Sequence, residues 1–354
     1  MTLQLDDYRL LGRSGLRVSP LSLGAMTFGM AAEWGSSAED ATRMFNHYLE
    51  HGGNFIDTAN FYAGGNSERE LGKLMAGRRE QVVMATKYSL TMQPGDPNAS
   101  GNHRKNMMRA VEDSLKRLNT DYIDLLYLHI WDARTPVDEI LRAFDDLVRA
   151  GKILYAGISD TPAWQISRMQ AIADLRGWSP LVALQVPYNL ADRTVEREFM
   201  GMAQEMGLGV LPWSPLAGGV LTGKYSREDL AAARQPMAAL TDRKSINLAS
   251  GRLSEHSLEV AVTLKEVADE MGKSAAQVAL AWTLQHPAVT SPIIGARTFA
   301  QFEDNLGALD VVFDDEHLTR LDEVSRLEPC FPYTLIDTPT SAAMFGNVKV
   351  AKRR

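Results

Sequence analysis

Short runs of apolar residues alternate along the chain with segments in which apolar residues recur every three or four positions. The runs predict strands, and the periodic segments predict helices. Several runs are apolar almost throughout, which is typical of strands covered on both faces. The eight predicted strands are Leu21–Ala25, Asn54–Ala59, Val82–Lys87, Ile123–His129, Ile153–Ser159, Ala183–Tyr188, Val210–Ser214 and Val289–Gly295.

Capping residues mark where the intervening helices begin and end. Ser37 predicts one N-cap, and Thr135 and Thr161, each followed by proline, predict two more. Gly151 and Gly177 predict the ends of two of these helices. Strands and helices therefore alternate regularly, as parallel strands joined by helical crossovers require.

This alternation predicts an α/β fold, a closed (β/α)8 barrel of the TIM type. A doubly wound open sheet is the alternative, and it requires a glycine-rich G-x-G-x-x-G turn after the first strand. The chain lacks that turn and reads Leu-Gly-Ala-Met at residues 23–26. We expect a single domain over residues 1–354.

Two segments fall outside the eight repeats. Residues 8–19 predict an N-terminal β-hairpin that turns at Ser14-Gly15 and lies at the bottom of the barrel. Residues 217–252, after the seventh strand, are expected to form a long loop. A loop of that length inside a compact domain is usually a lid or a binding loop.

Composition limits the classes of function. The chain has 354 residues, and its net charge of −7 argues against a nucleic-acid or anionic-membrane partner. A single cysteine, Cys330, excludes an internal disulfide. No segment approaches the roughly 18 consecutive apolar residues that cross a bilayer, and the acidic start does not resemble a signal peptide. We therefore expect a cytoplasmic protein.

Polar residues end three neighbouring strands. Asp57 lies in the last part of the second strand and Tyr62 just after it, Lys87 ends the third strand and His129 ends the fourth. In a barrel these carboxyl ends share one rim, so the four side chains are expected to converge. A nearby ammonium lowers the pKa of a tyrosine, and a histidine can hydrogen-bond a carbonyl oxygen. Together they could protonate a carbonyl while another species delivers hydride.

Six short segments in register on successive strands resemble the aldo-keto reductase superfamily, and the resemblance covers essentially the whole chain. The sequence is most similar to the bacterial group that also resembles potassium-channel beta subunits. The segments are Asn54–Tyr62, Ala85–Lys87, Asp121–His129, Ala156–Ser159, Gln185–Asn189 and Pro212–Gly219.

The resemblance implies reversible, NADPH-dependent reduction of an aldehyde or ketone. It implies that Asp57, Tyr62, Lys87 and His129 form a catalytic tetrad in which Tyr62 is the general acid. The implied cofactor-binding residues are Gly24, Ala25, Met26, Asp57, Ser159, Asp160, Gln185, Trp213, Ser214, Pro215, Leu216, Ala217, Gly218, Lys224, Gly295, Arg297, Gln301, Asp304 and Asn305.

Among these residues, the resemblance implies that Trp213 stacks on the nicotinamide, that residues 214–218 meet the pyrophosphate and that Lys224 reaches a phosphate. Arg297 lies where a helix begins after the eighth strand, a position that suits an anion. A guanidinium binds a phosphate bidentately, so Arg297 favours NADPH over NADH. Gln301 and Asn305, one helical turn apart, are expected to meet the adenosine.

The chain departs from the family pattern at Asp160, where asparagine is usual. That carboxylate either changes cofactor affinity or caps the following helix. Channel-subunit relatives usually carry asparagine at the His129 position, so His129 favours reduction over cofactor sensing. A cofactor-sensing regulatory subunit is nevertheless the alternative function, and a lyase with Lys87 as a Schiff-base nucleophile is a third.

Three further expectations concern ligands and partners. The remaining histidines do not pair at metal-ligand spacing, so no metal site is predicted. A small-molecule carbonyl is the expected substrate, and the helix surfaces leave room for a homo-oligomer. Candidates for an apolar substrate wall are Met26, Met30, Trp34, Phe61, Tyr88, Trp131 and Phe331.

Overall fold

The computed structural model describes residues 2–30, 34–232, 243–336, 346 and 348. Parts of the predicted lid (residues 217–252) and of the C-terminal tail lie outside these residues. None of the described helices is both long and apolar enough to span a membrane.

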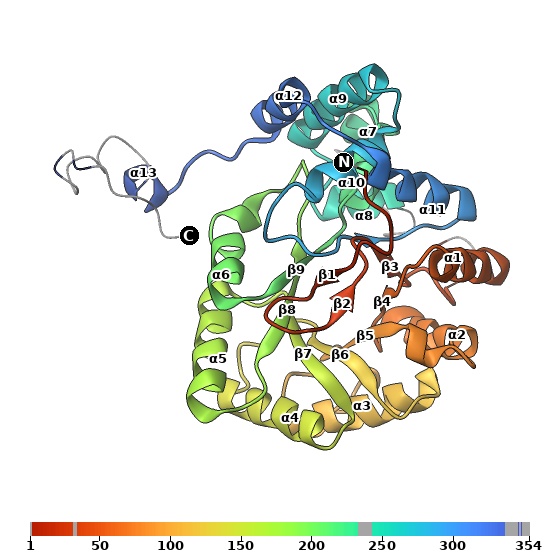
Figure 1. The fold of residues 1–354 in the computed structure, drawn as a ribbon, viewed down its shortest axis with the longest axis vertical. Coiled ribbons are helices and arrows are strands. Elements are labelled where there is room, and N and C mark those ends of the chain that lie inside the picture. The colour runs from red at the N-terminus through yellow and green to blue at the C-terminus, as the bar shows by residue number, and fades with distance from the viewer. Residues whose placement is uncertain (1, 31–33, 233–242, 337–345, 347, 349–354) are drawn as a thin grey trace.

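Eight parallel strands form a ring surrounded by helices (Figure 1), which confirms the predicted (β/α)8 barrel. From β3 to β9 each strand pairs with the next in chain order, and β10 pairs with β3. A single parallel bridge between Val210 and Val289 brings the two ends of the sheet together. The strands are β3 (Ser22–Gly24), β4 (Phe55–Asp57), β5 (Val83–Tyr88), β6 (Ile123–Leu128), β7 (Ile153–Ser159), β8 (Leu181–Pro187), β9 (Gly209–Trp213) and β10 (Ile293–Ile294).

The last barrel strand is much shorter than predicted. Within the predicted range 289–295, only Ile293 and Ile294 pair as a strand. Pro292 lies between this pair and the bridge at Val289. Because proline has no N–H to donate, it interrupts the hydrogen-bond ladder at that point.

Helices cover the outside of the barrel, and two of them, α7 and α8, fall inside the segment predicted as a long loop. Helix α13 lies apart from the barrel in Figure 1. The helices are α1 (Ala38–Glu50), α2 (Asn66–Leu74), α3 (Arg104–Leu118), α4 (Val137–Arg149), α5 (Ala163–Arg176), α6 (Phe199–Met206), α7 (Arg227–Ala232), α8 (Arg243–Ala249), α9 (Glu255–Glu270), α10 (Ala275–Thr283), α11 (Phe299–Leu306), α12 (Asp315–Ser325) and α13 (Tyr333–Ile336). Short 3-10 segments are η1 (Tyr62–Gly65), η2 (Arg79–Gln81), η3 (Thr194–Glu196), η4 (Ala217–Thr222) and η5 (Gly307–Asp310).

One predicted N-cap is confirmed and two are wrong. The Ser37 side chain accepts a hydrogen bond from the backbone of Asp40 and caps α1. Helices α4 and α5 instead begin one residue later, with the prolines at the cap positions. The hydroxyls of Thr135 and Thr161 donate to Asp132 and to the Ser159 carbonyl, so they bind the preceding loops rather than the helices.

The predicted N-terminal hairpin is present and packs against the end of the barrel opposite the site described below. Strands β1 (Arg9–Leu10) and β2 (Arg17–Val18) pair antiparallel. The side chain of Leu11 is fully buried in the cluster that fills the barrel interior. Gly12 has a left-handed φ of +55°, and an added Cβ would collide with the carbonyl oxygens of Val182 and Gly207. The hairpin therefore closes the floor of the barrel.

We expect Leu11→Ala to lower the free energy of unfolding by about 2–5 kcal/mol, because it leaves a cavity in the barrel interior. Urea denaturation measures this change. The control is Leu10→Ala in the same hairpin, where the side chain is 58% exposed and a change below about 0.5 kcal/mol is expected. An equal decrease in the free energy of unfolding for the two variants would contradict the conclusion that Leu11 closes the floor of the barrel.

Candidate active site

The four residues predicted to converge do so at the carboxyl end of the barrel. Asp57 ends β4, Lys87 lies in β5, His129 follows β6, and Tyr62 opens the 3-10 segment after β4. The fully buried Lys87 ammonium donates to Asp57 Oδ1 at 2.5 Å, to the Thr58 carbonyl at 2.7 Å and to Tyr62 Oη at 3.3 Å. One lysine therefore joins the carboxylate to the phenol.

Asp57 is held from two sides. Its second oxygen accepts a hydrogen bond of 2.8 Å from Gln185 Nε2, which reaches it from β8. The carboxylate thus links three strands, β4, β5 and β8, across the barrel mouth. The family resemblance implied only that Gln185 binds the cofactor, so its hydrogen bond to Asp57 was not predicted.

The ion pair keeps Lys87 charged. Burial alone would lower the pKa of the lysine, but the neighbouring Asp57 raises it above its ordinary value. A lysine must lose its proton before it can attack a carbonyl. The raised pKa therefore disfavours the reading of Lys87 as a Schiff-base nucleophile.

Tyr62 stands edge-on to His129, with ring centroids 5.8 Å apart. Burial raises the pKa of Tyr62, while the Lys87 charge opposes that shift without overcoming it. The net direction is opposite to the lowering expected from the sequence. Tyr62 consequently carries its proton at neutral pH, and Lys87 stands where it would stabilise the phenolate that remains after proton transfer.

His129 is nearly buried and neutral. Burial, with a smaller contribution from the Lys87 charge, lowers the pKa of His129 to about 3. Its Nδ1 atom has no hydrogen-bond partner among the described residues. A neutral imidazole next to the tyrosine can orient a carbonyl oxygen without competing for the role of acid.

Asp160 and Trp213 form a second contact at the mouth. The indole Nε1 of Trp213 donates to Asp160 Oδ1 at 3.1 Å. Asp160 has a left-handed φ of +36°, and its side chain does not cap α5, which starts at Ala163 without a side-chain cap. Of the two roles considered for Asp160, helix capping is therefore wrong.

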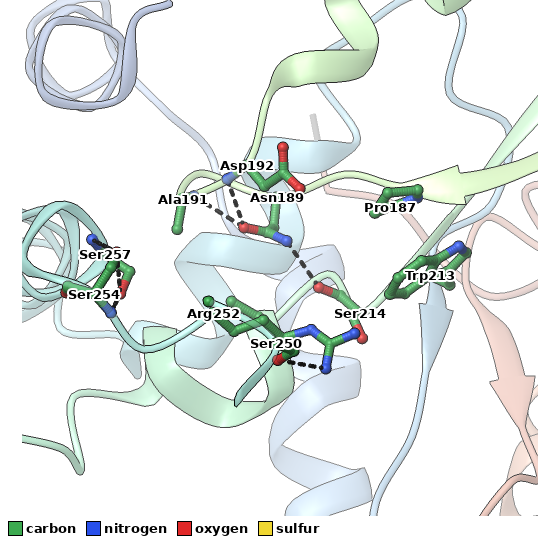
Figure 2. Close-up of a pocket in the computed structure, with 12 residues that line it drawn as sticks. Pro187, Asn189, Ala191, Asp192, Trp213, Ser214, Ser250, Arg252, Ser254 and Ser257 are labelled. Carbon is green, nitrogen blue, oxygen red and sulfur yellow. Dashed lines mark hydrogen bonds between the residues drawn. The ribbon is translucent and has the colours of Figure 1, made fainter. Parts of the chain in front are cut away.

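The loop after β9 is held in an unusual backbone conformation by two asparagines. Ser214 and Ala217 have backbone φ values of +50° and +49°, which residues other than glycine rarely adopt. Asn189 Nδ2 donates to the Ser214 carbonyl at 3.1 Å, and Asn247 Nδ2 donates to the Gly218 carbonyl at 3.1 Å. Figure 2 shows the first of these bonds. The predicted pyrophosphate loop is thus shaped by contacts with other parts of the chain.

A pocket of about 260 Å³ opens beside this loop at the carboxyl ends of β8 and β9 (Figure 2). The Arg252 guanidinium lies over the Trp213 ring, 5.5 Å from its centre. The lining residues are Pro187, Asn189, Ala191, Asp192, Trp213, Ser214, Ala217, Ser250, Gly251, Arg252, Ser254 and Ser257.

Four cations gather near the mouth without acidic partners. Lys224, Arg243, Arg252 and Arg297 form no ion pair within the part of the chain that the structure describes. Arg297 and Arg243 add to burial in lowering the pKa of Lys224, and Arg297 and Arg252 act likewise on Arg243. Unpaired cations that repel one another suit a ligand with several phosphates, so these residues fit a dinucleotide phosphate.

Sequence reasoning missed Arg243 and Arg252. Both belong to the long segment predicted after the seventh strand, where two arginines among many polar residues carry no motif. Only the fold brings them beside Arg297, which follows β10 some 45 residues or more further along the chain. Their positive charge, in a segment predicted to cover the barrel mouth, was the one signal in the sequence that could have suggested phosphate binding.

The segment after β10 contributes some of its predicted residues to the mouth. Gly295, Arg297 and Gln301 are exposed, and the Gln301 side chain accepts a hydrogen bond from the Arg297 amide. Asn305 is buried in α11. Both carboxylate oxygens of Asp304 accept hydrogen bonds from the first turn of α10, so its described contacts are structural.

The remaining predicted cofactor residues differ in accessibility. Gly24 and Ala25 are buried in the barrel wall, and a Cβ at Gly24 would crowd Ile293 at 2.8 Å. Met26, the next residue, is exposed. Ser159 is buried at the end of β7, and Lys224 is exposed with its Nζ folded over Gly219. The side chains of the strand residues therefore have less access to a ligand than those of the loops.

Comparison with known proteins gives the family. The model of the Aldo/keto reductase family matches residues 20–326. The chain belongs to the aldo/keto reductase family. It is 36% identical to a norsolorinic acid reductase of Aspergillus flavus over 96% of this chain and 86% of that protein. It is 34% identical to an aryl-alcohol dehydrogenase [NADP(+)] of Phanerodontia chrysosporium, over 91% and 86%.

A third relative is named for a different role. A probable voltage-gated potassium channel subunit beta of Oryza sativa is 38% identical over 91% of this chain and 98% of that protein. The sequence resemblance, including its link to channel subunits, is thereby confirmed. This aldo/keto reductase is an oxidoreductase, and its family uses a nicotinamide cofactor on small carbonyl compounds.

We expect kcat/KM for carbonyl reduction to stay flat between about pH 5 and pH 8. His129 titrates near 3, below this range, and the raised pKa of Tyr62 lies above it. A pH series with NADPH at saturating concentration measures the profile. An inflection near 6.5 that disappears in His129→Gln would contradict the neutral, buried histidine.

Proposed function

We propose that this aldo/keto reductase uses NADPH to reduce an aldehyde or ketone to an alcohol, with Tyr62 as the proton donor. The observation that carries the proposal is the Lys87 ammonium, which bonds both Asp57 and Tyr62 in a buried site. The relative named as an aryl-alcohol dehydrogenase [NADP(+)] supports the reaction class and the cofactor.

The residues divide the work of the reaction as follows. A bound NADPH would supply the hydride for the carbonyl carbon. His129 orients the carbonyl oxygen through its neutral imidazole, next to the phenol of Tyr62. Tyr62 passes its proton to that oxygen as negative charge develops there, and Lys87 stabilises the resulting phenolate. Asp57 holds the Lys87 ammonium in place, and Gln185 in turn holds the Asp57 carboxylate.

The phosphates of NADPH would be held by the four unpaired cations and by the loop of residues 214–218. Arg297 is assigned to the 2′-phosphate and Lys224 to the pyrophosphate, with Arg243 and Arg252 close to both. Trp213 would stack on the nicotinamide, and Gln301 and Asn305 would face the adenosine. Preference for NADPH follows because NADH lacks the phosphate that Arg297 would bind.

The substrate would carry a sizeable apolar group. Met26, Phe61 and Ile130 are exposed apolar side chains, and the last two lie one residue from Tyr62 and His129. Exposed apolar residues beside polar ones are typical of a ligand-binding mouth. Phe331, by contrast, follows α12 and is 78% exposed, so it does not support the substrate wall.

A cofactor-sensing regulatory subunit is the second candidate, favoured by the channel-subunit relative. His129 favours reduction over sensing, because a residue that orients a carbonyl serves turnover. Efficient multiple turnover on any carbonyl would decide for the reductase. Tight NADPH binding without turnover would decide for the regulatory subunit.

We expect Tyr62→Phe to lower kcat by at least about 100-fold, because the substitution removes only the hydroxyl group that donates the proton. NADPH binding is expected to stay within about twofold. The assay follows loss of NADPH absorbance with a panel of aldehydes, ketones and quinones. Tyr8→Phe, which removes an exposed hydroxyl at the hairpin, is the control and is expected to retain full activity. Loss of cofactor binding together with activity in Tyr62→Phe would point to a structural role.

We expect Arg297→Ala to weaken NADPH binding by about 10- to 100-fold and NADH binding by less than about threefold, because a charge-assisted contact to the 2′-phosphate is lost. Titration of each cofactor against the protein measures both constants. Arg176→Ala removes an exposed arginine at the end of α5 and is the charge-matched control. Equal weakening of both cofactors would contradict the 2′-phosphate assignment.

A further inference from the structure

Buried carboxylates in this protein are paired with cations. Asp57, Glu68, Asp124 and Asp145 are each less than 9% exposed, and each has a lysine or arginine nitrogen within 2.7 Å. Such pairing is expected, because a charge removed from water is costly unless an opposite charge or several hydrogen bonds replace the solvent.

Asp160 departs from this rule. It is partly buried at the barrel mouth, but no ion pair of Asp160 occurs among the described residues. Its contacts are the neutral indole N–H of Trp213 and the neighbouring Ser159. The Lys87 charge acts on Asp160, but that ammonium is already bonded to Asp57. Among the described residues, the Asp160 carboxylate therefore has hydrogen-bond donors but no cation bonded to it.

The charge of Asp160 reaches the reacting groups. The Asp160 carbonyl accepts a hydrogen bond of 3.2 Å from the N–H of Trp131, two residues after His129. Ser159, just before Asp160, lies in register with Gln185, which bonds Asp57. Burial raises the pKa of Asp160 and the Lys87 charge opposes that shift, while the Asp160 charge itself raises the pKa of Tyr62. Hydride and proton must reach the same carbonyl group, which requires the nicotinamide ring to lie beside the tetrad as well. Asp160 is thus close to the ring in any productive complex.

We propose that Asp160 makes the site discriminate between the two redox states of its cofactor, binding NADP+ more tightly relative to NADPH than an uncharged residue would. The nicotinamide ring carries one positive charge in NADP+ and none in NADPH. A carboxylate without a cation of its own attracts the first and gains nothing comparable from the second. This inference rests on the proposed function and adds the preferred redox state of the bound cofactor.

The charge of Asp160 would also shift the equilibrium between bound reactants and bound products. Hydride transfer converts the neutral ring into a cationic one, so an anion at Asp160 stabilises the product side of reduction and the reactant side of alcohol oxidation. It favours slow release of NADP+ after reduction. An asparagine at the same position would keep the hydrogen bond to Trp213 but lose this effect.

Asp160→Asn is the matched variant for the test. The amide oxygen still accepts from Trp213 Nε1, the side chain has the same size, and asparagine tolerates the left-handed φ of +36° as aspartate does. The control is Asp121→Asn, which makes the same change in net charge at an exposed position before β6, at the floor end of the barrel.

The experiment measures the dissociation constants of NADP+ and NADPH for the full-length protein and both variants, by calorimetry and by cofactor fluorescence at pH 7.5. We expect Asp160→Asn to raise the ratio Kd(NADP+)/Kd(NADPH) by about tenfold, equivalent to ~1.4 kcal/mol. Asp121→Asn is expected to leave the ratio unchanged. A rise in the ratio confined to Asp160→Asn supports the proposal.

Two results would overturn it. An unchanged ratio in Asp160→Asn would show that its charge does not distinguish the redox states. Equal weakening of both cofactor forms would show that Asp160 only orders Trp213. If the unmodified protein bound neither cofactor, the proposed reductase function itself would fail, which is a different outcome from an unchanged ratio between two measurable constants.

Discussion

The buried contact between Lys87 and Asp57 is the interaction on which the rest of the site depends. A charged lysine with no exposed surface is tolerated only because a carboxylate, a backbone carbonyl and a phenol surround its ammonium. The carboxylate ends β4 and the other two partners follow it in the chain, while the lysine belongs to β5. The electrostatic demand of one side chain therefore determines where the neighbouring loop must run.

The same demand explains the protonation states around it. Lys87 remains an ammonium because Asp57 is close, and its positive charge helps to keep His129 neutral. Tyr62 keeps its proton because burial outweighs the attraction of the lysine for a phenolate. A single ion pair thus leaves the tyrosine as the acid and the histidine as a neutral orienting group.

Sequence reasoning predicted the barrel, the floor hairpin and the convergence of Asp57, Tyr62 and Lys87, because strand patterns and strand ends are local signals. It could not predict the direction of the Tyr62 pKa, since burial depends on the packing of the whole mouth. It also missed Arg243, because a cation far along the chain enters the site only through the fold. The short length of β10 was not predicted either, because the effect of a proline on the hydrogen-bond ladder depends on how the strands pair.

Two kinds of backbone support meet at the mouth. Asp57 and Lys87 belong to barrel strands, whereas the loop after β9 depends on single side-chain hydrogen bonds from Asn189 and Asn247 to positions with left-handed φ. The residues of the tetrad therefore lie in or directly after barrel strands, and those assigned to the cofactor phosphates lie outside the strands. This difference is consistent with a cofactor that enters and leaves during turnover.

The floor hairpin has a practical consequence for shortened forms of the protein. The family match begins at residue 20, after both hairpin strands have ended at Val18. A chain trimmed to that boundary would keep every residue of the tetrad but lose Leu11, Leu16 and Val18 from the cluster that fills the barrel interior. Water would then reach apolar side chains of the barrel interior from below, so we expect the trimmed chain to be less stable than the full one.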